Sequence, residues 1–374
     1  PIYKSGETTW YVDEEGIITL QVGEKIYGEG ETEKLNKNIQ IESKVTPSSD
    51  YVKATIEIEI TYEGEIESIT INGESIEIPE KQDGKYIISK EVTENGEYKV
   101  EVKAKDGTKN KEIVKVEELT EDMEIWNRAD MESFRDKVNS GRTYEGKTVK
   151  VMADIDLEGS SNNWIPIANY TANNSLRFKG TFDGNNKTIS GLFINTSNGY
   201  QGLFGINDGE IKNIKVNGQI NVEDFYSDGI VGYNNGIINN CHNSVSIDGN
   251  GIAIGGITGL NNSGNITNCS NLVTLKGYAV VGGIAGDNRS NINACFNKGN
   301  IVATNMTAGG IVGYHVTGKM YNCYNTSSIA GSRCFAGGIN GAAGHSGYAT
   351  AYTYNCYNIG SISGLELVGN ITGW

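Results

Sequence analysis

The stretch GGITGLNNSGNITNCSN, residues 255–271, decides the fold of this chain because its pattern returns along the sequence. A Gly-(Leu/Ile)-x-Gly core recurs with its last glycine at Gly205, Gly232, Gly259, Gly286, Gly313, Gly341 and, in the degenerate form NITG, Gly373. The steps between these glycines are 27, 27, 27, 27, 28 and 32 residues. A near-constant period of this length is the signature of a repeat architecture, in which each copy is one structural unit.

Cysteine and asparagine repeat in phase with the glycines. The cysteines are replaced by Ile214 in the first copy and otherwise stand at Cys241, Cys269, Cys295, Cys323 and Cys356. Asparagines follow two residues later at Asn243, Asn271, Asn297, Asn325 and Asn358. Asparagine tolerates the left-handed backbone of a tight bend, and its amide can bond to an equivalent amide in the next copy. We therefore expect both sets to form structural ladders through stacked repeats.

Side-chain type identifies the kind of repeat. Each copy carries short apolar bursts, such as GGIVGY (309–314) and KMYNCYN (319–325), separated by Gly, Asn and Ser, which oppose helices. These bursts predict short β-strands with too few apolar residues per copy to bury a core alone. Stacking each copy on the next, with equivalent strands about 4.8 Å apart, solves this problem. The sequence thus predicts a parallel β-solenoid with about 27 residues per coil.

The region before the repeats has a different pattern. Alternating apolar residues predict strands in ATIEIEITY (54–62), ESITINGESIEI (67–78), GEYKVEVKA (96–104) and a last segment ending near Val116. Asn72-Gly73, inside the second of these, is a strong hairpin signal. Several short strands at this spacing predict a β-sandwich over residues 38–119.

A short helix is predicted between the sandwich and the repeats, within a unit that covers residues 120–374. RADMESFRDKVNSG (128–141) presents one apolar stripe at helical spacing, made of Met131, Phe134 and Val138. Asp130 can cap its start, and Gly141 can end it. We expect this helix to cover the apolar core and free strand edges of the first coil. A plain linker helix is the alternative.

Residues 1–37 allow more than one interpretation. GIITLQVGEKI (16–26) predicts one or two strands, which could be the tail of a preceding module. The other interpretation is an extended strand donated to a neighbouring subunit, which would make this segment a route to self-assembly.

Charge is divided unevenly along the chain. The net charge of −15 over 374 residues lies in residues 1–125, which hold 30 acidic and 15 basic residues against 16 of each in residues 126–374. Nucleic acids and anionic membranes require a basic patch, so neither is an expected partner. No apolar run approaches 18 residues, so no segment that crosses a membrane is expected within this chain.

Neither a cofactor nor a metal site is predicted. Five of the six cysteines follow the repeat, Cys334 does not, and none forms a CxxC pair. We therefore expect free thiols, small and buried in the five, rather than zinc ligands or disulfides. No phosphate-cradling loop is present, because no Gly-x-x-Gly is followed by a helix or by Lys-Ser/Thr. Calcium binding by the Asp and Asn turns is an alternative that the sequence neither predicts nor excludes.

Three stretches between residues 141 and 205 resemble a family of bacterial surface proteins. GRTYEGKTVKVMADIDLEG (141–159), FKGTFDGNNKTISGLFI (178–194) and GLFG (202–205) look like the opening of bacterial surface proteins with GLUG repeats, which also precede IgA1-cleaving metallopeptidases. The resemblance implies a right-handed parallel β-helix on an extracellular, adhesin-like protein, and implies no activity. The peptidase relatives use an HExxH helix, and none of this chain's histidines is followed by Glu. TENGEYKVEVKAKDG (93–107) further resembles Ig-like modules of bacterial surface proteins.

Three functions follow as expectations. The first is non-enzymatic adhesion at the bacterial cell surface, with a host glycan or an extracellular-matrix protein as partner. The second is a β-helix polysaccharide lyase or hydrolase, for which Asp154 and Asp156 lie two residues apart on one strand face. The third is a structural subunit of a surface filament or pilus. Catalytic residues are not predicted under the first function.

The best candidate ligand-binding residues lie in an excursion between the last two glycine motifs. AAGHSGYATAYTY (342–354) lengthens the repeat and brings His345, Tyr348, Tyr352 and Tyr354. An exposed tyrosine combines a rigid apolar ring with a hydroxyl, which suits contact with a sugar or a protein. The alternative is a surface loop with no ligand.

Overall fold

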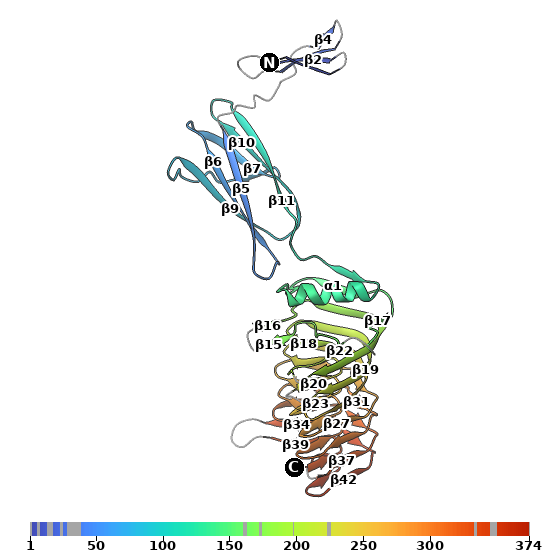
Figure 1. Cartoon of the computed structure of the whole chain (residues 1–374). Helices are drawn as coiled ribbons and strands as arrows, with labels where there is room; N and C mark the ends of the chain where they lie inside the picture. Colours follow the sequence, from blue (N-terminus) through green and yellow to red (C-terminus); the bar gives the residue numbers. More distant parts are fainter. Residues whose placement is uncertain are drawn as a thin grey trace. The chain divides into compact units, whose positions relative to one another are not determined.

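A computed structural model shows the fold (Figure 1) and describes residues 2–5, 8–12, 18–22, 25–27, 39–159, 163–171, 174–196, 198–222, 226–332, 335–344 and 350–373. The chain divides into two compact units, Pro1–Leu119 and Thr120–Trp374. Both units are built from β-strands, and the described residues contain one α-helix. Each unit is considered by itself.

The first unit begins with a small antiparallel sheet. Its strands are, in order, β1 (Ile2–Ser5), β2 (Thr8–Val12), β3 (Ile18–Val22) and β4 (Lys25–Tyr27). The strands predicted around residues 16–26 are therefore β3 and β4, and they pair within this sheet.

Two antiparallel sheets follow and share one core. One has the order β5-β6-β9, with β5 (Gln40–Pro47), β6 (Ala54–Thr61) and β9 (Lys85–Val92). The other has the order β11-β10-β7-β8, with β7 (Ile66–Ile71), β8 (Glu74–Ile76), β10 (Gly96–Ala104) and β11 (Lys109–Val116). Alternate residues of both sheets point into a common apolar cluster, as in Ile56, Ile58, Val100 and Val102. Asn72 and Gly73, both with positive φ, make the predicted hairpin turn between β7 and β8.

The second unit is a parallel β-solenoid of about eight turns with about 27 residues per turn, which confirms the prediction from the repeat. Its largest sheet has 18 strands, which are β12 (Met123–Ile125), β13 (Thr148–Val151), β14 (Ile155–Asp156), β17 (Thr181–Thr196), β19 (Glu210–Val222), β22 (Ile237–Gly249), β25 (Asn265–Thr267), β26 (Ser270–Asn271), β27 (Leu275–Gly277), β30 (Asn291–Asn293), β31 (Phe296–Asn297), β32 (Ile301–Ala303), β35 (Gly318–Tyr321), β36 (Tyr324–Asn325), β37 (Ile329–Gly331), β40 (Ala351–Tyr354), β41 (Tyr357–Asn358) and β42 (Ile362–Gly364).

Two six-stranded parallel sheets complete the turns. One consists of β18 (Phe204–Asn207), β21 (Val231–Asn234), β24 (Thr258–Asn261), β29 (Ala285–Asn288), β34 (Val312–His315) and β39 (Asn340–Ala343). The other consists of β20 (Tyr226–Asp228), β23 (Ala253–Gly255), β28 (Val280–Gly282), β33 (Thr307–Gly309), β38 (Phe335–Gly337) and β43 (Val368–Gly369). A short hairpin of β15 (Tyr170–Thr171) and β16 (Asn174–Ser175) lies outside these sheets.

A tight turn within each coil explains some of the repeated glycines. A Cβ on Gly309 would lie 1.9 Å from the carbonyl oxygen of Val312, and one on Gly282 would lie 2.0 Å from that of Ala285. No side chain fits at such distances, so the turn between β28 or β33 and the next strand requires glycine.

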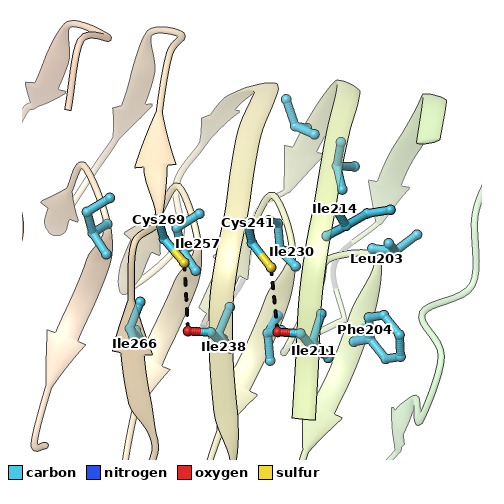
Figure 2. Close-up of a cluster of buried hydrophobic side chains, with 14 of the residues drawn as sticks. Leu203, Phe204, Ile211, Ile214, Ile230, Ile238, Cys241, Ile257, Ile266 and Cys269 are labelled. Atoms are coloured by element: carbon cyan, nitrogen blue, oxygen red, sulfur yellow. Dashed lines mark hydrogen bonds between the residues drawn. The ribbon is translucent and has the colours of Figure 1, made fainter. Parts of the chain in front are cut away.

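The interior of the solenoid is made of apolar columns, one residue per coil. Figure 2 shows Cys241 and Cys269 pointing into this core beside Ile230, Ile238 and Ile257. Ile214 pairs with Cys241 in register, so the first copy fills the cysteine position with an aliphatic side chain. The cysteines thus occupy positions at which a small apolar group is needed.

Helix α1 (Arg128–Asn139) places its apolar stripe in the same core. Met131, Phe134 and Val138 are buried, as predicted, and Figure 1 shows the helix beside the first turns of the solenoid. The predicted N-cap was wrong. Asn127 is the N-cap and accepts a hydrogen bond from the backbone N–H of Asp130, whose carboxylate in turn accepts one from the backbone N–H of Trp126. Asp130 thus stands three residues after the cap, and its carboxylate binds the residue before the cap.

Among the residues that the structure describes, no helix is long and apolar enough to cross a membrane.

Candidate functional site

Two of the four predicted ligand-binding residues lie on β40. Tyr352 and Tyr354 are 54% and 49% exposed, so about half of each side chain is open to a ligand. His345 and Tyr348 lie outside the described residues. The candidate site therefore comprises β40 and the neighbouring strands of the same sheet.

Strand register brings further aromatic residues to the same surface. Tyr321 pairs with Tyr354, and their rings stack with centroids 5.2 Å apart. Phe296, Tyr324 and Tyr357 follow one another in a second column, with centroids 5.1 and 5.2 Å apart and rings within 6° of parallel. We call the six residues Phe296, Tyr321, Tyr324, Tyr352, Tyr354 and Tyr357 the tyrosine face.

The local sequence explains why two tyrosines face outward in each of the coils that contain Cys323 and Cys356. In Tyr321-Asn322-Cys323-Tyr324, Asn322 adopts a left-handed conformation with φ of 57° and bends the chain. Cys323 then points into the core, and the tyrosines on both sides of the bend point away from it. The last coil repeats this arrangement at Asn355, with φ of 52°.

The buried asparagines hold these strands in register below the surface. Asn271 Nδ2 donates to Asn297 Oδ1 and Asn297 Nδ2 donates to Asn325 Oδ1, both at 2.7 Å. The predicted asparagine set is linked in this way from Asn243 to Asn358, and Asn358 donates on to Asn370. The same amides also bond to backbone groups two residues later, as Asn297 does with Gly299. Each amide therefore fixes its own turn and the next coil.

The cysteine column serves packing. The five described cysteines in the column have free thiols, and four of them, all except Cys356, are fully buried. Burial raises the pKa of the Cys241 thiol well above its ordinary value, so the thiol stays neutral. Cys241 Sγ donates weakly to the carbonyl oxygen of Asn239 at 3.3 Å. These features make Cys241 a neutral packing residue of the core.

Sequence inspection missed a second buried asparagine ladder. Asn207, Asn234, Asn261 and Asn288 donate from one to the next at 2.7–3.0 Å. The signal was present, because each of these asparagines stands two residues after the last glycine of the repeated motif. His315 takes the next place in this column and is buried, with no hydrogen-bond partner at Nε2.

The tyrosine face continues into an uncharged polar surface. In register with Tyr321 and Tyr354, the preceding coils place Asn239, Thr267 and Asn293. In register with Phe296, they place the half-buried His242 and the buried Ser270, which share a hydrogen bond of 2.8 Å. Neither column carries a carboxylate from β22 to β41. The same columns are charged in the first coils, with Lys150, Asp183, Lys212 and Lys215.

The carboxylates considered for catalysis have structural partners. Asp154 Oδ1 accepts from the backbone N–H of Thr188, and Asp156 Oδ1 accepts from that of Glu158. Asp228 is fully buried, which raises its pKa well above its ordinary value. Asp287 forms an ion pair with Arg289 at 3.0 Å. Among the described residues, no group of three or more His, Cys, Asp and Glu side chains is placed to hold a metal ion.

Comparisons with known proteins add no family to this description. No protein-family model and no curated protein matches the chain.

Proposed function

We propose that this chain is a non-enzymatic, adhesin-like protein of the bacterial cell surface that binds a host glycan or an extracellular-matrix protein through the tyrosine face. The observation that carries the proposal is the pair of in-register aromatic columns, which carry no carboxylate from β22 to β41.

Stacking prepares these side chains for binding. A tyrosine offers a large amphipathic contact surface with few rotatable bonds, and binding loses affinity for each side chain that it must immobilise. Tyr324 lies between Phe296 and Tyr357, and the register of three strands holds its ring in place. Little conformational entropy is left to lose when such a ring meets a ligand.

The finer architecture belongs to the same proposal. We take the solenoid as right-handed and of the GLUG-repeat type, with α1 as the cap of its first coil. Support for the cap comes from Phe134, whose ring meets those of Tyr144, Phe178, Phe182 and Phe204 at centroid distances of 5.1 to 6.4 Å. We take the two-sheet region as an Ig-like module, because three strands face four in the orders β5-β6-β9 and β8-β7-β10-β11.

A binding screen with matched variants tests the proposal. The full chain is applied to arrays of glycans and extracellular-matrix proteins, together with Tyr324→Ala, Tyr357→Ala and the control Tyr278→Ala. Tyr278 is 49% exposed and stands between β27 and β28, outside both aromatic columns. We expect a ligand whose binding weakens at least about tenfold in the two face variants and stays unchanged in the control. Equal binding by all variants would remove the tyrosine face as the site, and turnover of a polysaccharide would overturn the non-enzymatic assignment.

A further inference from the structure

We infer that the ligand of the tyrosine face is a neutral, extended polysaccharide that lies along the stacking direction of the coils. This inference rests on the proposed function and names its ligand class. The occupant we favour is a β-1,4-linked pyranose chain with no ionised groups.

The spacing of the columns supports a polymer that runs across the coils. Equivalent groups recur at every coil, and the aromatic centroids are 5.1 and 5.2 Å apart in the second column. In an extended chain of pyranoses joined through equatorial bonds, each sugar advances by about one ring length, which is close to this spacing. Successive sugars would therefore meet equivalent side chains.

The lack of charge favours a neutral chain over an anionic one. From β22 to β41 the two columns present amide, hydroxyl, imidazole and aromatic groups and no carboxylate. Two lysines adjoin the columns here: Lys319, on β35 beside Tyr321, and Lys298, whose Nζ lies 5.2 Å from the centroid of the Phe296 ring. A polyanion would instead require a run of unpaired cations. In the first coils, where lysines are present, Lys150 and Lys212 flank Asp183 in one column, so the charges alternate.

Hydrogen-bonding groups on this surface complement sugar hydroxyls. The side-chain oxygens of Asn239 and Asn293 accept hydrogen bonds from Asn268 and Asn322, respectively. Their Nδ2 groups donate no hydrogen bond to another described residue. The hydroxyls of Tyr321, Tyr324 and Tyr357 can both donate and accept. A sugar hydroxyl has the same double capacity, so an amide donor and a phenol can each pair with it.

The length of the columns sets the length of the ligand. From β22 to β41 each column has five positions, Asn239 to Tyr354 in the first and His242 to Tyr357 in the second. With about 4.8 Å between strands, four steps span about 19 Å. A disaccharide covers only a fraction of this distance, whereas a hexasaccharide covers all of it.

Calorimetry with oligosaccharides of graded length tests the inference on the full chain. The probes are β-1,4-linked glucose oligomers from disaccharide to hexasaccharide, with α-1,4-linked oligomers of equal length, which coil, as the comparison. We expect the dissociation constant to fall at least about tenfold from disaccharide to hexasaccharide in the β series and to stay high in the α series. Equal affinity for short and long oligomers, or for both linkages, would overturn the inference that an extended polysaccharide lies along the stacking direction of the coils.

Variants at opposite ends of the columns give a second readout. Asn239→Ala removes a donor on β22, and Tyr357→Phe removes one hydroxyl on β41 while keeping the stacked ring. We expect both changes to weaken binding of the hexasaccharide, with Tyr278→Phe as the unaffected control. Melting temperatures of all variants check that the solenoid is intact. If either end variant, folded, leaves hexasaccharide binding unchanged, the ligand does not span the columns and the inference fails.

The outcomes separate this inference from the proposed function. If a matrix protein binds through the tyrosine face and no β-linked glycan does, the polysaccharide is excluded while the adhesin assignment stands. Stronger binding of a carboxymethylated or sulfated derivative than of the neutral oligomer would also exclude it. If neither glycans nor matrix proteins bind, both proposals fail.

Discussion

At the scale of single residues, the left-handed bend before the cysteine position is the most regular feature of the solenoid. Asparagine occupies it in every copy but one, at Asn213, Asn240, Asn268, Asn322 and Asn355. The exception is Ala294, with φ of 53°. This conformation costs residues other than glycine about 1–2 kcal/mol, and asparagine offsets part of the cost through local hydrogen bonds.

Ala294→Asn should therefore stabilise the protein. The bend keeps its geometry, and the new side chain suits it better, so the free energy of unfolding should rise by roughly 0.5–1 kcal/mol. Chemical denaturation of the second unit within the full chain measures this change. Asn322→Ala, the opposite exchange one coil later, should lower the stability by a similar amount. A loss of stability in Ala294→Asn would show that the cost of the left-handed conformation does not decide which residue is more stable at this position.

His315 makes a prediction about pH. Burial lowers the pKa of His315 to about 4 in the folded protein, against an ordinary value near 6.5. The unfolded chain therefore binds a proton below about pH 6.5, while the folded chain resists it down to about pH 4. The free energy of unfolding should fall by about 2–3 kcal/mol across this window as the pH drops, with no further contribution below it.

The matched variant is His315→Asn, which continues the ladder from Asn288 without a titrating group. The free energy of unfolding of this variant should not show the fall of about 2–3 kcal/mol between pH 6.5 and 4 that His315 causes in the parent. The pH dependence due to other groups should be the same in both proteins. Denaturation curves at several pH values compare the two proteins. Identical pH profiles would mean that His315 is not protected from protonation.

At the scale of the elements, the buried amide ladders hold the parallel strands in register. Asn297 donates to Asn325 and Gly299 and accepts from Asn271 and Gly299, so both N–H groups and both oxygen lone pairs of its amide are used. Removing one partner of a buried hydrogen bond leaves the others unsatisfied.

Asn297→Ala should cost about 3 kcal/mol or more, because several buried groups lose their partner together. Asn358→Ala, near the end of the same ladder and 8% exposed, should cost less, since water can replace part of what is lost. Thermal unfolding of both variants gives the comparison. A larger effect at Asn358 would argue against the ladder as a cooperative element.

Helix α1 supplies a further test at this scale. Phe134 is fully buried and touches four aromatic rings, so Phe134→Ala should lower the stability by about 3–5 kcal/mol. Met131→Leu conserves volume and should cost less than about 1.5 kcal/mol. A mild effect of Phe134→Ala would mean that the first coil does not need the helix.

The elements also show which features could be read from the sequence. The repeat, the strands β6, β7, β8, β10 and β11 and the buried stripe of α1 were predicted, because each rests on a local periodicity, whereas β5 and β9 were not predicted. The N-cap was not, because Asn127 and Asp130 both suit a helix start and only the backbone shows which one precedes the first turn. Tyr352 and Tyr354 were singled out, whereas Tyr321, Tyr324 and Tyr357 were not, because their common surface depends on the register between coils.

At the scale of the whole molecule, stability should vary along the stack. The last coil exposes apolar side chains that the inner coils bury, with Ile359 and Leu365 at 74% and 77% exposure. Inner coils have a paired coil on both sides, whereas β40, β41 and β42 pair on one side within the described residues. In a linear repeat protein, local opening is easiest where one interface is missing.

Hydrogen exchange should show this gradient. Backbone amides of β25 to β36 should exchange slowest, and those of β40 to β42 should exchange at least about tenfold faster. Mass spectrometry of peptides from the full chain resolves these segments. Uniform protection along the solenoid would indicate that it opens only as one cooperative block.

The in-register columns also bear on how such a chain changes over generations. Because each coil bonds mainly to the coils beside it, inserting or deleting one period of about 27 residues joins cysteine to cysteine and asparagine to asparagine at the new junction. Recombination between the repeated segments of the gene can therefore lengthen or shorten the rod without passing through a product that cannot fold. Under such exchange the length of the in-register columns becomes a heritable trait that varies in whole steps.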